Sequence, residues 1–335
     1  MGSILSPADP IRSQPPYFDS ESGSWVLTRY DDVLTALHEP RLHPEGEATP
    51  KEIRERTRAA LSPARLTDWQ THIGTKAESL AAGLAADRTV DVVGEFGRPW
   101  ALDAAVYITG VQPVDHARLE SLSRKVAAAA AEPIDDGLRS QATVASDELE
   151  RSFQWGDFPM AVPAFVALSQ TLVCLLANAW LVLLRHPQEA ERLRERQDLM
   201  PGAIDELLRF APLAGTVPRR AEAQVEVAGV VVPAGGRVVL RLDSANRDPS
   251  RLEDPERFDI DRGGTGHLTL GSGPRSCAGA PLLRMAMAAV TGPFCRHFSR
   301  RAEDPVWRGG SGYRWPEPLR IIPARASGDR SRATR

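Results

Sequence analysis

An almost unbroken apolar stretch, Ala164 to Leu184, constrains the fold of this 335-residue chain more than any other feature. It is about long enough to cross a bilayer as a helix. However, Ser, Gln, Thr and Asn side chains interrupt it, and no second stretch of this kind occurs. A helix that is apolar on every side and lies outside a membrane must be covered by protein. We therefore expect a long helix at the centre of a large domain, ending at His186-Pro187.

The rest of the chain predicts a mainly α protein with a smaller β portion, an α+β fold. Further helices are expected within 49–151, at 188–196 and 201–210, and from Ala280 onward. Strand-like runs occur at 24–30, 225–235, 237–242 and 319–322. We expect one domain over residues 1–325 and a disordered basic tail at 326–335.

Charge and cysteine usage narrow the class of protein. The net charge of −3 provides no general attraction to nucleic acid or membrane, so neither is an expected partner. Three cysteines do not make a disulfide framework, and no charged-then-apolar leader is visible. Basic residues are nearly all Arg, which is typical of a high-GC bacterial genome. These features predict a cytoplasmic bacterial protein, with Cys174 and Cys295 as packing residues.

A second feature, the run Leu270 to Gly279, carries chemistry. It places Cys277 in a glycine-punctuated loop directly before a helix. Backbone N–H groups and a helix N-terminus favour a thiolate, which suits an axial iron ligand. Gly271 and Gly279 would allow a flat macrocycle to approach the backbone closely. In isolation, a cysteine among glycines is more often an ordinary buried thiol.

The whole run resembles the cysteine-pocket signature of the cytochromes P450, aromatic-Gly-x-Gly-x-Arg/His-x-Cys-x-Gly, with Leu270 in place of the aromatic residue. Glu206 and Arg209 have the family's E-x-x-R spacing, which puts both on one helical face. The resemblance implies that they form a buried ion pair, completed by Arg257. Because further matches span nearly the whole chain, it also implies the P450 fold and bound haem b.

The resemblance assigns cofactor contacts to particular residues. Cys277 matches the axial ligand of the haem iron, and Arg54, Arg219 and Arg275 match contacts to the two propionates. Pro50 stands where the family has a histidine, so one expected anchor is missing. Electrons are expected from a ferredoxin and an NAD(P)H-dependent reductase, with Arg275 and Arg284 as possible docking residues.

On the central helix, Ala167-Leu168-Ser169-Gln170-Thr171 matches the family's Ala/Gly-Gly-x-Asp/Glu-Thr motif. Thr171 either donates a hydrogen bond toward iron-bound oxygen or bonds back to its own helix. Leu168 replaces a glycine that leaves room for dioxygen. Gln170 replaces an acid and cannot exchange a proton near neutral pH. Protons would then travel through Ser169, Thr171 and water, or come from the substrate, and Pro163 predicts a late or kinked helix start.

Two regions are shorter than the family pattern: the B–C region, reduced to Leu42 to Ile53, and the F–G region between about Glu132 and Pro163, where the lid helices normally lie. Both reductions would open the distal pocket. We expect a wide mouth suited to a bulky or carrier-tethered substrate, or a partner protein that completes the pocket.

Three functions follow from these features. The first is a haem-thiolate monooxygenase that tailors a natural-product intermediate. The second is a haem catalyst without reductive oxygen activation, such as a peroxide-using enzyme, a dehydratase or a rearrangement enzyme. The third is a non-catalytic auxiliary protein of P450 type, against which the intact Cys277 argues.

Overall fold

The central helix of the computed structural model spans Ala161–Arg185. It consists of α7 (Ala161–Val166), a π-helical turn (Ala167–Thr171) and α8 (Leu172–Arg185). By length and hydropathy it could cross a membrane, but its apolar part is 89% buried inside the protein. The prediction of a long buried central helix is therefore confirmed. Pro163 lies in the first turn, where a missing N–H costs little, and the π turn follows it.

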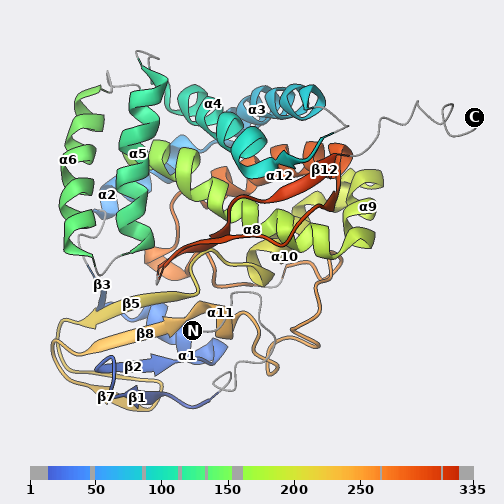
Figure 1. Ribbon diagram of the computed structural model, residues 1–335. Coiled ribbons are helices and arrows are strands. Elements are labelled where there is room, and N and C mark those ends of the chain that lie inside the picture. Colours follow the sequence, from blue (N-terminus) through green and yellow to red (C-terminus); the bar gives the residue numbers. More distant parts are fainter. Residues whose placement is uncertain are drawn as a thin grey trace, which may run out of the picture.

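Other helices surround this one in the upper part of Figure 1. The structure describes residues 14–45, 50–84, 88–111, 115–132, 135–152, 161–264, 266–310 and 312–323, so the predicted disordered tail lies outside them. The remaining α-helices are α1 (Tyr30–His38), α2 (Lys51–Ala60), α3 (Pro63–Gly83), α4 (Arg98–Thr109), α5 (His116–Ala131), α6 (Asp136–Ser152), α9 (Pro187–Glu195), α10 (Met200–Phe210), α11 (Leu242–Ala245) and α12 (Ala280–His297). Shorter helical segments are a π-helical one (Val92–Gly97) and two 3₁₀ turns (Gln197–Leu199 and Gly273–Arg275).

The strands form one five-stranded sheet, visible below the helices in Figure 1, and three smaller sheets. The large sheet has the order β1 (Tyr17–Asp19), β2 (Ser24–Leu27), β8 (Arg237–Arg241), β5 (Thr216–Ala221) and β3 (Leu42–Pro44). The smaller sheets are β4 (Val90–Asp91) with β12 (Arg320–Pro323) and β9 (Phe298–Arg301), β6 (Val225–Val227) with β7 (Val230–Val232), and β10 (Trp307–Gly309) with β11 (Arg314–Pro316). The predicted α+β class is confirmed.

The strands that were predicted from the sequence are those with a local signal, such as a recognisable turn. The β6–β7 hairpin turns at Ala228 and Gly229, both with positive φ (53° and 78°), as expected for a two-residue hairpin loop. Strand β5 was not predicted, because Pro218 and two adjacent arginines conceal its pattern. It becomes a strand by pairing with β8 on one side and β3 on the other.

Two packed cores hold these layers together. The larger core joins the helices around α8, where the Trp180 ring stacks on that of Phe294 in α12 at a centroid distance of 4.9 Å. The smaller core lies between α1 and the large sheet and includes Leu27 and Leu240. The cysteine loop runs past the end of α1, where His38 contacts it, and leads into α12. It therefore lies where the helical part meets the sheet.

Candidate active site

The cysteine loop is held by its own backbone. The Cys277 N–H donates to the Leu270 carbonyl oxygen at 2.7 Å, and the Ala280 N–H donates to the Cys277 carbonyl oxygen at 3.3 Å. Gly271 has φ +71°, a left-handed conformation that glycine adopts without strain. A Cβ on Gly279 would meet no atom within 4 Å, so the backbone beside Cys277 faces open space. The loop thus presents the cysteine, whose side chain is exposed.

The surroundings of Cys277 act on its thiol in two directions. Burial by the loop around the sulfur raises the pKa of the thiol, although part of the side chain is open to solvent. A hydrogen bond from the Gly279 N–H and the charges of Arg54, Arg284 and Arg58 lower the pKa, but burial outweighs them. The net effect of these surroundings on the pKa of the Cys277 thiol is therefore upward, which disfavours the thiolate. A bound cation would supply the missing stabilisation.

Four arginines surround the loop without a carboxylate partner among the described residues. Arg54 and Arg58 of α2 donate to the Ser276 carbonyl oxygen. Arg275 donates to the carbonyl oxygens of Glu39 at 3.3 Å and Leu42 at 3.1 Å, together with Pro40 and His43 Nδ1. Within the described part of the chain, the Arg219 side chain donates only to the Pro218 carbonyl oxygen, at 2.9 Å. We call Arg54, Arg58, Arg219 and Arg275 the arginine cluster.

Arg219 is the most constrained member of the arginine cluster, since only 7% of it is exposed. Burial, and then the nearby charge of Arg275, lower the pKa of Arg219 to about 10. Burial and the charge of Arg58 likewise lower the pKa of Arg54, whose Nε is buried and has no partner among the residues that the structure describes. An uncompensated buried cation is costly unless an anion accompanies it. The arginine cluster thus has the electrostatics of an anion-binding site.

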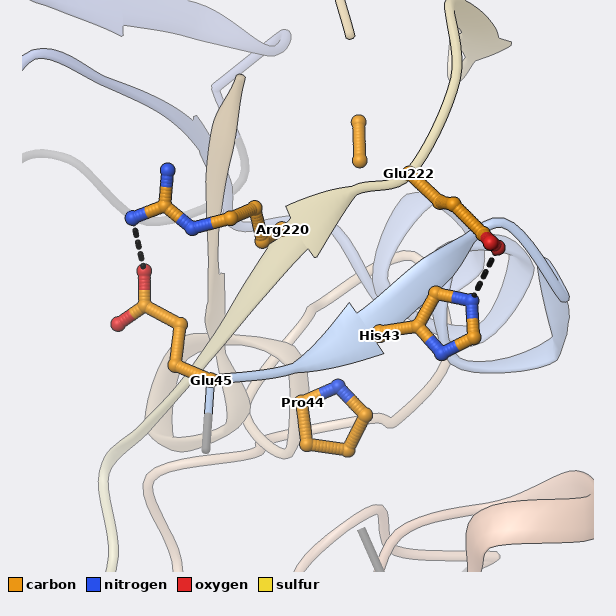
Figure 2. Close-up of a pocket in the computed structure, with 6 residues that line it drawn as sticks. His43, Pro44, Glu45, Arg220 and Glu222 are labelled. Atoms are coloured by element: carbon orange, nitrogen blue, oxygen red, sulfur yellow. Dashed lines mark hydrogen bonds and ion pairs between the residues drawn. The ribbon is translucent and has the colours of Figure 1, made fainter. Parts of the chain in front are cut away.

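On the adjacent outer face of the sheet, the basic side chains are paired with carboxylates, unlike those of the arginine cluster (Figure 2). Successive side chains of a strand point to opposite faces, so Arg220 is exposed where Arg219 is buried. Arg220 pairs with Glu45 at 3.5 Å, and His43 Nε2 pairs with Glu222 at 2.8 Å. These residues line an open hollow of about 530 Å³. Because its charged groups are paired with one another, this hollow is a weak candidate for a charged ligand.

The residues around Cys277 fit a haem group. Two propionates would neutralise part of the arginine cluster, including buried Arg219. Open backbone at Gly279 leaves room for a flat ring beside the sulfur. On the central helix, Ala167 is exposed although its neighbours Val166 and Leu168 are buried, so this helix also has an open face. Cys277 would supply the iron ligand, and the bound group would supply redox chemistry that no side chain here provides.

The predicted structural ion pair is present on α10. Glu206 and Arg209 are both 0% exposed, and Arg209 Nε lies 2.6 Å from Glu206 Oε2. Arg257 does not complete the pair with its side chain, which is 64% exposed and contacts Asp259 at 3.2 Å. Only its carbonyl oxygen accepts from Arg209, at 3.2 Å. The cation that approaches Glu206 instead is Arg262, at 3.5 Å, which corrects the prediction.

The π turn of the central helix changes what Thr171 can do. Seven other helical threonines donate to the carbonyl oxygen four residues earlier: Thr35, Thr57, Thr67, Thr71, Thr75, Thr109 and Thr143. For Thr171 that carbonyl belongs to Ala167, and it accepts from the Leu172 N–H across the wider turn. The Thr171 hydroxyl has no hydrogen-bond partner in the part of the chain that the structure describes. Of the two predicted roles, bonding back to the helix is therefore not observed.

A cavity of about 220 Å³ lies beside this turn. One wall is a stripe of small residues on α5, and the opposite side has two aromatic rings. Its lining consists of Arg98, Arg124, Ala127, Ala128, Ala131, Gln170, Thr171, Cys174, Tyr313 and Trp315. Burial raises the pKa of Tyr313. Burial raises the pKa of Cys174 to about 12, so this thiol stays protonated.

Gln170 is fixed at both ends of its amide. Its Oε1 accepts from Arg98 Nη1 at 3.3 Å, and its Nε2 donates to Ser123 Oγ at 3.0 Å. Arg98 in turn holds Glu317 through two hydrogen bonds of 2.7 and 2.6 Å. Ser169 is 2% exposed, and its Oγ has no hydrogen-bond partner in the ranges that the structure describes. Leu168 is buried in the main core and does not line the cavity, so its side chain takes no room there.

The reduced regions take the form of short connections. Residues 39–50 join α1 to α2, and residues 132–135 join α5 to α6. The helix that follows the short connection at 132–135, α6, keeps 17 residues and packs along α5, as Figure 1 shows. Because α5 lines the cavity, the cavity is covered on that side instead of widely open. Its volume is below the usual range of about 300–1,000 Å³ for ligand pockets.

Sequence reasoning missed Arg98, Glu317, Ser123 and the Tyr313–Trp315 wall. No local pattern marks the contact between Arg98 and Glu317, which lie 219 positions apart. Arg58 was discoverable, because it follows Arg54 by four positions and so lies on the same face of α2. The predicted docking residue Arg284 pairs with Asp205 at 2.7 Å, and this contact leaves it less available to a partner.

Comparisons with known proteins agree with this geometry. The family model described as Cytochrome P450 matches residues 177–306. Cytochrome P450 107B1 of Saccharopolyspora erythraea is 30% identical over 363 aligned residues, which cover 90% of this chain and 89% of that protein. The mycinamicin IV hydroxylase/epoxidase of Micromonospora griseorubida is 28% identical, covering 84% of this chain and 83% of that enzyme.

The fold has close counterparts among solved structures. The structure of P450BioI in complex with an acyl carrier protein ligated to hexadec-9Z-enoic acid superposes with a TM-score of 0.82. It covers 93% of this chain and 96% of that chain at 22% sequence identity. The predicted fold is therefore confirmed, including its long central helix and cysteine-pocket loop.

Proposed function

This chain belongs to the cytochrome P450 family, and on that premise we propose that it is a haem-thiolate monooxygenase that tailors a natural-product intermediate. The family implies haem b as the cofactor and a monooxygenase as the class of enzyme. Our proposal adds the role of each residue, the kind of substrate and the source of electrons.

The observation that carries the proposal is the position of Cys277 beside the arginine cluster, whose four cations lack carboxylate partners among the described residues. In our assignment Cys277 is the iron ligand, and Arg54, Arg219 and Arg275 bind the propionates. Gly271 shapes the loop, and Gly279 leaves the ring room. Bound haem supplies the oxidising chemistry, and the protein orients the substrate and controls the protons.

On the distal side, we assign proton handling to the central helix. The free Thr171 hydroxyl is a donor on the wall of the cavity. Ser169, two positions before Thr171, has a second hydroxyl without a partner among the described residues. Ala167 leaves the helix face open. Gln170 holds Arg98 and Ser123 and positions the turn without carrying protons itself.

A second function is favoured by Gln170. Its amide replaces the acid of the family motif, and both ends of the amide are engaged. An enzyme that uses peroxide, or one that dehydrates or rearranges its substrate, would not need an acid there. Turnover that survives anaerobically without a reductant would favour this alternative. Turnover that depends on both a ferredoxin–reductase pair and dioxygen would favour the monooxygenase.

In our proposal the substrate is tethered to a carrier protein or is bulky, and only part of a bulky substrate would enter the cavity of about 220 Å³. The mycinamicin enzyme acts on a natural product according to its name, and the P450BioI structure contains a carrier protein. We further propose a cytoplasmic location, where a ferredoxin and an NAD(P)H-dependent reductase supply electrons. Exposed Arg56 and Arg58 on α2 offer positive charge on the cysteine side for such a partner.

The first test is the visible spectrum of the reduced protein under carbon monoxide. The proposal predicts the Soret band of a thiolate-ligated carbonyl complex, and Cys277→Ser should abolish that band. The matched control is Cys295→Ala, which removes a buried thiol within α12 and should keep the band. Absence of haem in the purified protein, or a spectrum typical of a neutral ligand, would contradict the proposal.

A further inference from the structure

The cavity beside Thr171 contains two arginines, and both are neutralised. Arg98 is paired with Glu317, and the two side chains are 18% and 21% exposed. Arg124 is paired with Glu120 one helical turn away on α5. Neither glutamate is among the lining residues. The cavity therefore presents guanidinium groups to a ligand while its charge is balanced among the described residues.

Arg98 keeps hydrogen-bonding capacity for a ligand. A guanidinium has five N–H donors. Three are used, two toward Glu317 and one toward Gln170, which leaves one N–H on each terminal nitrogen. Burial alone would lower the pKa of Arg98, but the hydrogen bonds and charge of Glu317 outweigh burial and raise it. The remaining donors are thus permanently charged groups at the wall of the cavity.

Much of the remaining lining is apolar, beside the polar groups of Arg124, Gln170 and Thr171. Ala127, Ala128 and Ala131 form one wall, and Tyr313 and Trp315 contribute aromatic surface from the β10–β11 hairpin region. The Trp315 indole N–H is already used by Glu317, at 2.8 Å. An apolar pocket with few polar groups fixes a ligand's orientation through those groups. Of the two arginines on this lining, Arg98 is the more buried, since its side chain is 18% exposed and that of Arg124 is 56% exposed, so Arg98 is the stronger anchor for a ligand inside the cavity.

We propose that this cavity selects apolar ligands carrying a neutral carbonyl acceptor (a ketone, ester or thioester) over free carboxylates, with Arg98 as the specificity-determining donor and Glu317 as the residue that sets its charge. A carbonyl oxygen accepts from the remaining N–H groups at small desolvation cost. A carboxylate would bring an unbalanced charge into an apolar, already neutral pair. The inference rests on the proposed function and deepens it, because a thioester is the linkage of a carrier-tethered acyl substrate.

The test compares three probes of matched length by isothermal titration calorimetry on the haem-loaded protein at pH 7.5: 2-undecanone, methyl decanoate and decanoic acid. The wild-type chain should bind the ketone and the ester at least about tenfold more tightly than the acid. Glu317→Gln should reduce that ratio to about twofold or reverse it, because Arg98 then lacks its counter-charge. Arg98→Gln should weaken ketone and ester binding about tenfold.

The control is Glu303→Gln, which removes a carboxylate from an exposed pair with Arg320 and should leave the ratio unchanged. Melting curves identify any variant that fails to fold. If Arg98→Gln fails to fold, Arg98→Lys replaces it, because lysine keeps the positive charge but lacks the planar set of guanidinium N–H donors. Equal or tighter binding of the acid by the wild type, an unchanged ratio in Glu317→Gln, or no binding of any probe overturns the inference. Because no turnover is measured, failure here is distinct from failure of the carbonyl spectrum.

Discussion

On the cysteine side of the site, Arg54, Arg219 and Arg275 have no carboxylate partner among the described residues, whereas on the cavity side Arg98 and Arg124 each have one. Both sets are cations at the wall of a ligand site, but only the first leaves its charge for a ligand to balance. An anion therefore belongs beside Cys277, and a neutral molecule belongs beside Thr171. The pairing of the arginines distinguishes the cofactor side from the substrate side.

Arg209 provides the reference for a cation whose partner is part of the fold. We predict that Glu206→Gln lowers the free energy of unfolding by about 3–5 kcal/mol, because it leaves a fully buried guanidinium without its counter-charge. Urea denaturation of the apo protein measures this. Adding Arg209→Met to Glu206→Gln should recover part of the loss, since the pair is then removed as a whole. A loss below about 1 kcal/mol for Glu206→Gln would show that the backbone carbonyl oxygens that accept from Arg209, or water, compensate its charge.

The two sides should respond with opposite signs when an arginine is removed. Arg219→Met should leave the apo chain as stable as the wild type or about 1–2 kcal/mol more stable, because an uncompensated buried charge disappears. The same change should weaken haem binding at least about tenfold. Arg98→Gln should instead destabilise the apo chain by about 1–3 kcal/mol, because Glu317 loses its partner.

Melting of the apo protein and haem titration measure both effects. The matched control is Arg220→Met, on the same strand but on the outer face with Glu45, which should change neither stability nor haem affinity appreciably (Figure 2). If Arg219→Met destabilises the apo chain as much as Arg98→Gln does, the distinction between unpaired and paired cations is wrong.

The features that the sequence predicted are encoded locally, and the features that it missed depend on contacts between distant parts of the chain. The buried helix, the cysteine loop and the Glu206–Arg209 pair are local, because each is encoded in a short run with a period or a motif. The Arg98–Glu317 pair joins residues 219 positions apart, and only the packed fold brings them together. Likewise, the path of the chain after α10 decides that Arg262, and not Arg257, places its side chain near Glu206. The π turn at 167–171 had no recognisable signal, so the freed Thr171 hydroxyl could not be predicted.

One arginine on the cysteine side, Arg284, does have a carboxylate partner, Asp205. A change of Asp205 measures what this ion pair contributes. Hydrogen bonding from His267, and then from Arg284, holds the pKa of Asp205 at about 2, below its ordinary 3.8. A carboxyl with a lowered folded-state pKa contributes stability above its unfolded pKa and loses it as pH falls through the folded value. Asp205→Asn should therefore cost about 1–2 kcal/mol at pH 6, allowing for solvent screening, and progressively less between pH 4 and 2. A deficit in urea denaturation that is independent of pH would contradict the ionic origin of this contact.

The smallest change in stability is expected for Thr171 on the cavity side, and Thr109 provides the comparison. Because its hydroxyl has no partner among the described residues, Thr171→Val should change the free energy of unfolding by less than about 0.5 kcal/mol. Thr109→Val, which removes a buried hydroxyl bonded to the Ala105 carbonyl oxygen, should cost about 1 kcal/mol. If Thr171 donates to the reacting group, turnover of the Thr171→Val variant should nevertheless fall about tenfold, with Thr171→Ser restoring most of it. Unchanged turnover would leave the free hydroxyl without a catalytic role and would shift proton handling to Ser169 or to the substrate.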